Sequence, residues 1–479
     1  MSIQSVIKSI QDIMRKDAGV DGDAQRLSQL VWLLFLKIFD DKEKEYELVD
    51  GKYKSPLSSE LRWRNWAQDP EGMTGDELLD FINNKLFKKL KGLSFGASDD
   101  PRGFIVKEVF EDTYNYMKSG TLIRQVINKI NEIDFNRQED KHHFNEIYEH
   151  LLKELQSAGN AGEYYTPRPI TKFVVEMTDP KLGEIFLDPA CGTGGFLVSA
   201  LEYIRNSGEI KTAKDEKKLQ TSIKGVELKP LPHLLAITNM ILHGVETPQQ
   251  IKRDDMLSRP LREYGPKDRV DVITANPPFG GVVKDGTEAN FPQAFRTKET
   301  ADLFLVLFMH LLKPGGRAGI VLPDGTLFGE GIKSAIKEKL LQECDLHTIV
   351  RLPPGVFSPY AGVNTNLLFF EKGRPTKEVW YYQMPLPEGL RQYTKGRPIK
   401  DEEFEPVKKW FKNKTENEYA WKISIEEIKA RNYNLDFKNP NKKDDVEHKN
   451  PEEILKGLME KEGEIGEILK DVKKTIKHK

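Results

Sequence analysis

The stretch EIFLDPACGTGGFLVSALEYI, residues 184–204, decides the fold of the central part of this 479-residue chain. It begins with a short apolar run typical of a β-strand, continues through a glycine-rich turn, and ends in apolar residues at helical spacing. Gly192, Gly194 and Gly195 let the backbone turn sharply and approach a ligand closely. The following helix begins with N–H groups free to bind a carboxylate or phosphate. A dinucleotide-binding turn would need another glycine where Leu197 stands, so the turn alone does not identify the ligand.

The pattern of apolar residues divides the chain into three parts. Residues 159–375 alternate short β-type runs with amphipathic helices, which predicts an α/β domain with a mostly parallel sheet. Residues 1–158 carry apolar residues at helical spacing and predict an α-helical N-terminal domain, including a helix over 23–45 with Asp23 as its N-cap. Residues 376–479 start with a β-type run, become charged and lysine-rich, and end in a helical tail.

The composition excludes several classes of protein. The chain has 73 Lys+Arg and 75 Asp+Glu, so its global charge does not argue for nucleic-acid binding. Two cysteines are too few for a disulfide framework or a cysteine-rich zinc site, and they fit a reducing compartment. No apolar run approaches the roughly 20 residues of a membrane span, and the N-terminus lacks the apolar core of a signal peptide. We therefore expect a cytoplasmic protein that does not bind membranes.

Polar side chains follow the successive β-type runs of the central part. Glu227 ends the second run, where a carboxylate can accept hydrogen bonds from both hydroxyls of a ribose. Asp254 and Asp255 follow the third run, near the expected place of an adenine, and Asn276 follows the fourth. Ligands of open α/β sheets bind at the carboxyl ends of the strands. The joint order of these groups therefore predicts one nucleoside-binding site at that edge.

The order of four motifs, DPACGTGG, GVE, RDDML and NPPF, resembles that of S-adenosylmethionine-dependent methyltransferases of the adenine-N6 type, in their gamma arrangement. The resemblance spans residues 160–375 and implies a Rossmann-like catalytic domain with S-adenosyl-L-methionine as cofactor. AGEYYTPRPI, residues 161–170, is similar to the family segment that covers the methionine end of the cofactor, although Glu163 stands where related chains often carry glutamine. The cofactor-binding residues that the resemblance implies are Glu163, Tyr164, Tyr165, Thr166, Pro167, Arg168, Asp188, Thr193, Gly194, Gly195, Glu227 and Asp255.

The flanking segments narrow the resemblance to one group. AQRLSQLVWLLFLKIFDDKE, residues 24–43, resembles the N-terminal domain of modification subunits from type I restriction–modification systems. LPPGVFSPYAGVNTNLLFFEKG, residues 352–373, resembles their late catalytic segment. The resemblance implies four partners: double-stranded DNA, a separate specificity subunit that reads its sequence, a second copy of this chain, and a restriction subunit that is a translocase and endonuclease.

The C-terminal tail, residues 452–479, has an apolar stripe that includes Leu458, Ile465 and Val472. Such a stripe is suited to packing against another helix. The family resemblance favours the specificity subunit as the contact, while packing on the chain's own domain stays open.

The tetrapeptide Asn276–Phe279 gives the resemblance a chemical basis. An exocyclic adenine amine is a poor nucleophile because its lone pair is conjugated into the ring. The Asn276 side-chain oxygen and the Pro277 carbonyl can accept its two N–H groups, and the Pro277 and Pro278 rings fix the backbone. Each such acceptor is worth about 10²–10³ in rate. Phe279 offers a stacking face to a base flipped out of the duplex. Phe357 is a candidate second aromatic contact, with core packing as an equal alternative.

Two other functions are weighed against this one. A protein glutamine-N5 methyltransferase of the same fold faces the same conjugated nitrogen, but usually has tyrosine where Phe279 stands and lacks the helical N-terminal domain. A non-catalytic nucleoside-binding scaffold would fail to bind S-adenosylmethionine. The complete set of motifs favours the DNA methyltransferase.

Overall fold

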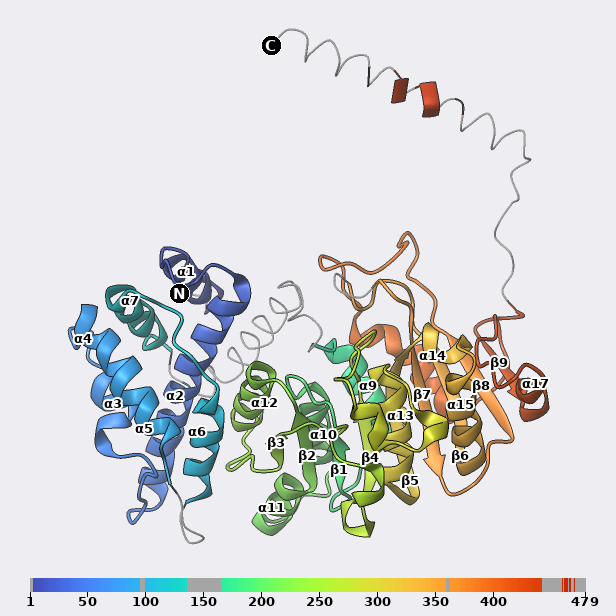
Figure 1. Cartoon of the computed structure of the whole chain (residues 1–479), viewed down its shortest axis with the longest axis horizontal. Coiled ribbons are helices and arrows are strands. Elements are labelled where there is room, and N and C mark those ends of the chain that lie inside the picture. The colour runs from blue at the N-terminus through green and yellow to red at the C-terminus, as the bar shows by residue number, and fades with distance from the viewer. Residues whose placement is uncertain are drawn as a thin grey trace.

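The computed structural model describes residues 3–94, 100–133, 135, 165–358 and 362–441, together with a few residues between 459 and 469. The N-terminal helices form one body, and a large twisted sheet with helices on both faces forms the other (Figure 1). Helices α2 and α6 of the first body pack against α12 of the second.

The N-terminal body is α-helical, as the sequence predicts. Its helices are α1 (Ile3–Met14), α2 (Asp23–Val49), α3 (Trp63–Trp66), α4 (Gly75–Asp80), a π-helical segment (Phe81–Leu86), α5 (Phe87–Lys91), α6 (Pro101–Glu111) and α7 (Gly120–Ile130). The predicted N-cap at Asp23 is wrong. Gly22 takes the extended N-cap conformation, with φ −134° and ψ 164°, so Asp23 is already the first helical residue. There its carboxylate pairs with Arg26.

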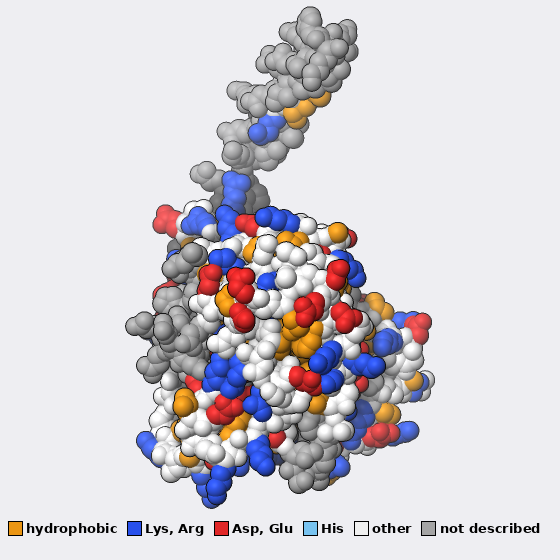
Figure 2. All heavy atoms as spheres, turned by 90° about the vertical axis from the view of Figure 1, so that its left-hand side faces the viewer, with side chains coloured by type: hydrophobic (Ala, Val, Ile, Leu, Met, Phe, Trp, Pro, Cys, Tyr) orange, Lys and Arg blue, Asp and Glu red, His pale blue; other side chains and the backbone are white. Residues whose placement is uncertain are grey.

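The outer face of the N-terminal body mixes positive and negative side chains, and no wide area of one sign is visible in the drawn part of that view (Figure 2). Lys85 and Lys89, for example, both pair with Glu60. Charges that are paired in this way have little excess potential to offer a DNA backbone.

The second body is built on a nine-stranded sheet of order β3-β2-β1-β4-β5-β7-β6-β8-β9. The strands are β1 (Phe186–Asp188), β2 (Ile223–Glu227), β3 (Ile251–Arg253), β4 (Val270–Ala275), β5 (Leu312–Pro323), β6 (Cys344–Arg351), β7 (Thr365–Lys372), β8 (Glu378–Gln383) and β9 (Ala420–Ser424). The five neighbouring strands β3, β2, β1, β4 and β5 pair in parallel, and so do β6 and β8. Strands β7 and β9 run antiparallel to their neighbours. The predicted, mostly parallel α/β fold is confirmed.

Helices cover both faces of this sheet and divide its core in two. One face is covered by α9 (Arg168–Thr178), α10 (Gly195–Asn206), α11 (Ala213–Ser222) and α12 (Pro230–Leu242), and the other by α13 (Thr300–Leu311) and α15 (Ile332–Glu343). Successive side chains of a strand alternate between these faces. Accordingly, Phe186 and Val272 join one apolar core, while their neighbours Leu187 and Ile273 join the other.

The chain after residue 375 continues the same sheet. Strands β8 and β9 pair with each other and extend the sheet beyond β6. Helix α16 (Glu405–Lys412) lies between these two strands in the chain, and α17 (Ile425–Ala430) follows β9. The division of the chain into domains at 158 and 375 stays a prediction. Of the tail stripe, Leu458 and Val472 lie outside the described residues, and Ile465 is 57% exposed. No helix among the described residues is long and apolar enough to cross a membrane.

Candidate active site

A cavity of about 330 Å³ opens at the carboxyl ends of β1, β2 and β4. The chain runs from β1 outward through β2 and β3 and then returns to place β4 on the other side of β1. Such a reversal of strand order separates the loops above the sheet and leaves a crevice for a ligand. Eight predicted site residues line the cavity: Thr166, Asp188, Thr193, Gly195, Glu227, Asp255, Asn276 and Pro278.

The other predicted site residues do not line this cavity. Glu163 and Tyr164 lie outside the described residues. Those that the structure describes away from the cavity wall are Tyr165, Pro167, Arg168, Gly194, Pro277, Phe279 and Phe357. Several of them hold the lining residues in place, as the contacts below show.

The glycine turn between β1 and α10 is held in a conformation that favours glycine. Gly192 and Gly194 have φ values of 53° and 80°. A Cβ atom added to Gly194 would lie 3.4 Å from Ala236 of α12, so the turn packs directly on that helix. The amide of Asn239 donates to the Thr193 carbonyl at 3.0 Å. The side of the turn that faces α12 is therefore fixed by packing and a hydrogen bond, and the side that faces the cavity is left for a ligand.

Two buried carboxyl groups lie beside the turn. Glu227, 7% exposed, accepts from the backbone N–H groups of Gly192 at 3.0 Å and Lys229 at 2.7 Å. Asp188, 1% exposed, accepts from the backbone N–H of Ala190 at 3.1 Å. Burial raises the pKa of Glu227 and raises that of Asp188 well above the ordinary aspartate value. No ion pair reaches either group within the described part of the chain, and the nearby Lys229 offsets the desolvation of Glu227 only in part.

The loop after β3 brings two more carboxylates to the cavity wall. Asp255 accepts from the backbone N–H of Leu257 at 2.9 Å, and Asp254 accepts from that of Asp255 at 2.8 Å. The backbone N–H of Asp254 donates to the Glu227 carbonyl at 3.1 Å. The loop is therefore tied to the strand that carries Glu227.

Asn276 lies where β4 ends, and its amide has one end bound and one end free. Its Nδ2 donates to the hydroxyl of Thr166 at 3.0 Å. Its Oδ1 is buried and has no hydrogen-bond partner among the described residues. A buried acceptor left unpaired costs about 1–3 kcal/mol, so its persistence points to a function. The arrangement offers a fixed acceptor to a donor that enters the site.

The two aromatic residues expected to contact a base touch each other. The Phe279 and Phe357 rings meet edge to face, with centroids 5.9 Å apart and planes at 81°. Phe279 is half-buried, whereas Phe357 is 1% exposed. Phe357 therefore supports Phe279 from behind, and only Phe279 has a ring surface open to a base.

The segment before α9 is fastened to the glycine turn. Arg168 donates to the Gly195 carbonyl at 2.9 Å, and Tyr165 is buried in the apolar core. These two anchors hold Thr166 between them, close to Asn276. Tyr165 and Arg168 thus shape the site without lining the cavity.

Sequence reasoning missed several lining residues. They include Met256, Gly281, Val282, Val283 and Lys284 in the loops, Phe196 on α10, and Thr300 and Phe304 on α13. Residues 281–284 come shortly after the tetrapeptide Asn276–Phe279, and this closeness in the sequence could have indicated that they lie at the site. The two α13 residues lie farther along the chain and needed the fold to place them.

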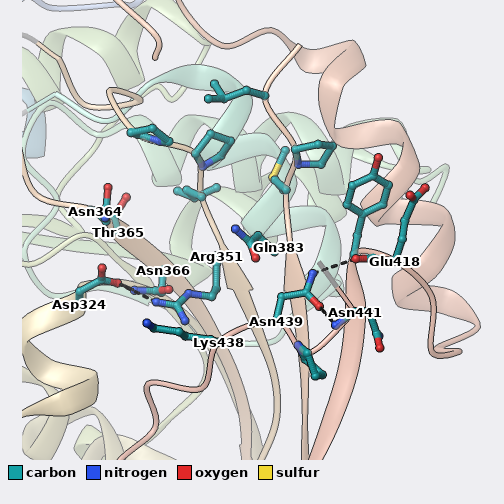
Figure 3. Close-up of a pocket in the computed structure, with 18 residues that line it drawn as sticks. Asp324, Arg351, Asn364, Thr365, Asn366, Gln383, Glu418, Lys438, Asn439 and Asn441 are labelled. Carbon is teal, nitrogen blue, oxygen red and sulfur yellow. Dashed lines mark hydrogen bonds and ion pairs between the residues drawn. The ribbon is translucent and has the colours of Figure 1, made fainter. Parts of the chain in front are cut away.

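A larger cavity, of about 1120 Å³, lies at the ends of β6 and β8 (Figure 3). Some of its polar groups bind one another or a residue beside the cavity: Asn366 donates to Asp324 at 2.6 Å, Arg351 lies 3.6 Å from Asp324, and Arg351 donates to Asp436, outside the lining, at 2.7 Å. Two of its charged groups, Arg351 and Asp324, therefore lie close enough to compensate each other. Volume alone does not locate the chemistry here.

Comparison with known proteins gives one consistent family. The family model described as N-6 DNA Methylase matches residues 139–449, and that of the HsdM N-terminal domain matches residues 3–130. The chain is 56% identical over 475 residues to the type I restriction enzyme EcoEI methylase subunit of Escherichia coli, covering 98% of this chain and 96% of that one. It is 28% identical over 442 residues to the EcoKI methylase subunit of Escherichia coli K12, covering 87% and 78%.

Solved structures agree with the sequence matches. A crystal structure described as a modification subunit of a type I restriction enzyme from Vibrio vulnificus YJ016 superposes with a TM-score of 0.83, at 45% identity, over 93% of this chain and 98% of that one. A chain from a structural study of complex assembly and conformational transition in the type I R-M system superposes with a TM-score of 0.81, at 38% identity, over 100% and 98%.

Proposed function

Because this chain belongs to the methylase subunits of type I restriction enzymes, within the N-6 DNA methylase family, we propose that the tetrapeptide Asn276–Phe279 holds the adenine that it methylates. The chain is an adenine-specific DNA methyltransferase of a type I restriction–modification system. The single observation that supports the proposed site best is the buried, unpaired Oδ1 of Asn276 beside a cavity lined with carboxylates.

The residues of the cavity fit S-adenosyl-L-methionine. Glu227 would accept from the ribose hydroxyls, Asp255 would lie at the adenine, and the glycine turn would face the methionine end. The volume of about 330 Å³ lies within the usual range of small-molecule sites, about 300–1,000 Å³. When bound, this cofactor supplies an electrophilic methyl group on a sulfonium.

The chain's own residues prepare the nucleophile. Thr166 binds the Nδ2 end of Asn276, which leaves the Oδ1 end for an N–H of the target amine. The Pro277 carbonyl accepts the second N–H, since its backbone is fixed between a strand and a second proline. Accepting both N–H groups concentrates electron density on the nitrogen. The nitrogen would then form the new N–C bond to the methyl carbon as the methyl–sulfur bond breaks, which leaves a neutral thioether, and the nitrogen would lose one proton to water.

The target adenine must leave the DNA stack to reach this site, at a cost of a few kcal/mol. The open face of Phe279 receives the flipped base, with Phe357 behind it. The described chain contains no recognised DNA-reading motif, so we assign sequence recognition to a separate specificity subunit. The complex also includes a second copy of this chain and a restriction subunit, and the tail of residues 452–479 joins the assembly. The study of complex assembly that contains a similar chain supports this proposal.

Reconstitution tests the proposal. The purified chain should bind S-adenosylmethionine but methylate DNA poorly and at no defined site. Adding its specificity subunit should give adenine methylation at one sequence, mapped along the DNA, and deleting residues 452–479 should weaken the assembly. Efficient site-specific methylation by the chain alone would contradict it. Transfer of labelled methyl to a release factor but not to DNA would instead support glutamine methylation.

A further inference from the structure

Helix α6 of the N-terminal body contacts the outer edge of strand β3 at Arg253. β3 is the last strand on its side of the sheet and pairs only with β2. An edge strand leaves outward-facing backbone N–H groups without a ladder partner. At Arg253 this donor is bound by the Glu108 carboxylate of α6, at 3.3 Å. A side chain of the N-terminal body therefore completes the hydrogen bonding of the catalytic sheet.

Further contacts make this junction specific. The Arg253 guanidinium pairs with Asp112 at 2.5 Å and approaches Glu111 at 3.5 Å, both at the end of α6. His233 of α12 is 1% exposed, and burial lowers its pKa to about 4, so its ring is neutral at pH 7. Its Nε2 lies 3.2 Å from the Ile251 carbonyl and donates to it. The outward-facing Ile251 carbonyl and Arg253 N–H of β3 are thus bound by α12 and α6, whose His233 and Glu108 side chains lie 3.9 Å apart.

The same strand leads directly into the cofactor cavity. Arg253 lies opposite Glu227 in the β2–β3 ladder, and the next two residues, Asp254 and Asp255, line the cavity. β3 is only three residues long, and the bond from Asp254 N–H to the Glu227 carbonyl ties its end to β2. The contact with Glu108 lies one residue before that bond. Loss of this contact would free the end of β3 on its outer side.

We infer that Glu108 is a positioning residue for the adenine end of the cofactor site, and that docking of the N-terminal helices on β3 is thereby coupled to cofactor affinity. Glu108 acts through the backbone of Arg253, which sets where Asp254 and Asp255 lie. The inference rests on the proposed cofactor site. Coupling of this kind is reciprocal, so the bound cofactor should also tighten the docking of α6.

Calorimetry with S-adenosylmethionine on the full-length chain tests the inference. Glu108→Ala should weaken binding about five- to tenfold, the loss expected for one hydrogen bond that holds the site. Glu108→Gln keeps an acceptor oxygen and should stay within about twofold of the native affinity. Lys107→Ala is the matched control, because Lys107 precedes Glu108 on the same helix and its side chain forms no hydrogen bond or ion pair with the described residues, so this variant should keep the native affinity.

A double-mutant cycle separates positioning from general stabilisation. Asp255→Ala should weaken binding about tenfold. If Glu108 acts through the Asp254–Asp255 loop, the double variant should be little weaker than Asp255→Ala alone, because contacts in one network are not additive. If the loss of affinity in the double variant equals the product of the two single losses, the inference is overturned. Native affinity in a folded Glu108→Ala protein would also overturn it. An Asp255→Ala variant and a Glu227→Ala variant that both bind normally would instead show that the proposed cofactor site is wrong.

Hydrogen exchange supplies a readout that does not depend on affinity. In the native chain, saturating cofactor should slow amide exchange in α6, and in Glu108→Ala this protection should be lost while exchange at Arg253 and Asp254 speeds up. Equal protection of α6 in both proteins would overturn the coupling.

Discussion

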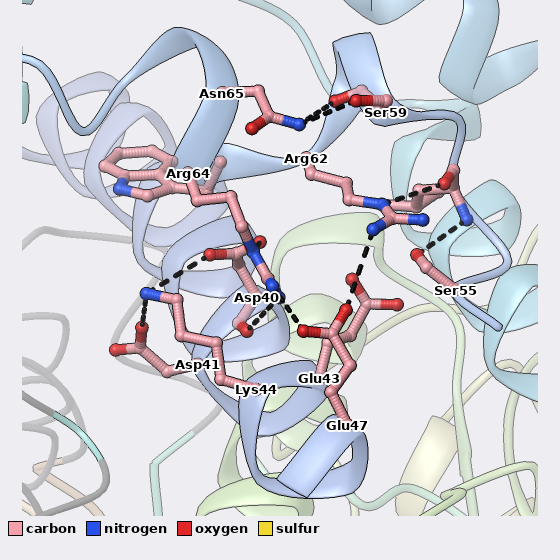
Figure 4. Close-up of polar contacts among 12 residues, drawn as sticks. Asp40, Asp41, Glu43, Lys44, Glu47, Ser55, Ser59, Arg62, Arg64 and Asn65 are labelled. Atoms are coloured by element: carbon pink, nitrogen blue, oxygen red, sulfur yellow. Dashed lines mark hydrogen bonds and ion pairs between the residues drawn. The ribbon is translucent and has the colours of Figure 1, made fainter. Parts of the chain in front are cut away.

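Two regions of the molecule bury pairs of carboxylates, and they satisfy them differently. In the N-terminal body, Asp40 and Asp41 of α2 are 1% and 2% exposed and lie among cations (Figure 4). Arg64 binds Asp40 at 2.8 Å, Lys44 lies 3.1 Å from Asp41, and Lys37 also pairs with Asp41. In the catalytic cavity, Asp188 and Glu227 are also buried, at 1% and 7% exposed, but among the described residues they accept only backbone N–H groups.

The difference teaches which buried charges serve folding and which serve a ligand. A buried carboxylate costs several kcal/mol unless a cation and hydrogen bonds compensate it. The N-terminal body supplies cations to Asp40 and Asp41 from its own helices, and the Asp40–Arg64 pair fixes how α2 and α3 pack. The cavity gives its carboxylates no ion pair among the described residues, and the raised pKa of Glu227 records the cost of its burial, which backbone N–H groups and the nearby Lys229 offset only in part. A polar ligand that donates hydrogen bonds offsets it, which is why perturbed carboxylates in a cleft mark a functional site.

The largest expected effect is on the free acceptor of the cavity. Asn276→Ala should lower single-turnover methyl transfer by about 10²–10³-fold, because it removes a fixed acceptor for the target amine. Calorimetry should show nearly native cofactor affinity. Thr166→Val, which keeps Oδ1 but removes the partner of Nδ2, should lose only about fivefold. Methyl transfer by Asn276→Ala within about tenfold of the native rate would remove Asn276 from the chemistry.

The next effect tests the N-terminal half of the comparison. Arg64→Ala leaves Asp40 buried with only Lys44 nearby, at 3.5 Å. Removing one partner of a buried pair costs about 3–5 kcal/mol, and because Arg64 is 20% exposed we expect about 3 kcal/mol in the free energy of unfolding. Urea unfolding measures it. Lys85→Ala, which breaks an exposed pair with Glu60, should leave the free energy of unfolding nearly unchanged. Equal stability of the two variants would show that the buried cluster does not hold the helices.

Removing Glu227 from the cavity should change cofactor binding, whereas removing Arg64 changes stability. Glu227→Ala should weaken cofactor binding roughly ten- to a hundredfold, since hydrogen bonds to a charged group are worth about 1.5–3 kcal/mol. Glu202→Ala on α10 is the matched control, because Glu202 is 44% exposed and does not line the cavity. Native affinity in a folded Glu227→Ala protein would remove Glu227 from the site.

The smallest expected effect concerns pH. Burial raises the pKa of Glu227, so in the free protein it takes up a proton at a higher pH than an ordinary glutamate. Cofactor affinity should therefore fall as the pH drops through that raised value, and Glu227→Gln should remove this dependence. The stability contribution has the opposite sign: it is present below the ordinary pKa and is lost as the pH rises through the raised one. Glu227→Gln should accordingly be more stable than the native chain at neutral pH, and a less stable variant would contradict this.

Local patterns predicted much of the fold. The apolar run before the glycine turn, the run ending at Glu227 and the run before Asn276 are strands β1, β2 and β4, and the helix expected over 23–45 is α2. In these elements the apolar residues repeat with the period of a strand or a helix, and this repeat can be read from a short stretch of sequence. The family suggested by the motifs is confirmed by the similar proteins.

Contacts between distant segments could not be predicted. The bond from Asn276 to Thr166 joins residues 110 positions apart, and that from Arg253 to Glu108 spans 145. The addition of β8 and β9 to the sheet depends on pairing with β6, which no local period encodes. For the same reason the sequence could not decide between stacking and packing for Phe357, which the fold buries. The assignments of individual site residues stay predictions.

A crystal structure of the chain with S-adenosylmethionine tests the central claim most directly, because the two cavities lie at different strands of one sheet edge. We predict the ribose hydroxyls on Glu227, the adenine beside Asp255, and the sulfonium methyl facing the region of Asn276 Oδ1. A cofactor bound instead in the larger cavity, beside Arg351 and Asn366, would contradict the account, as would a ribose that makes no contact with Glu227.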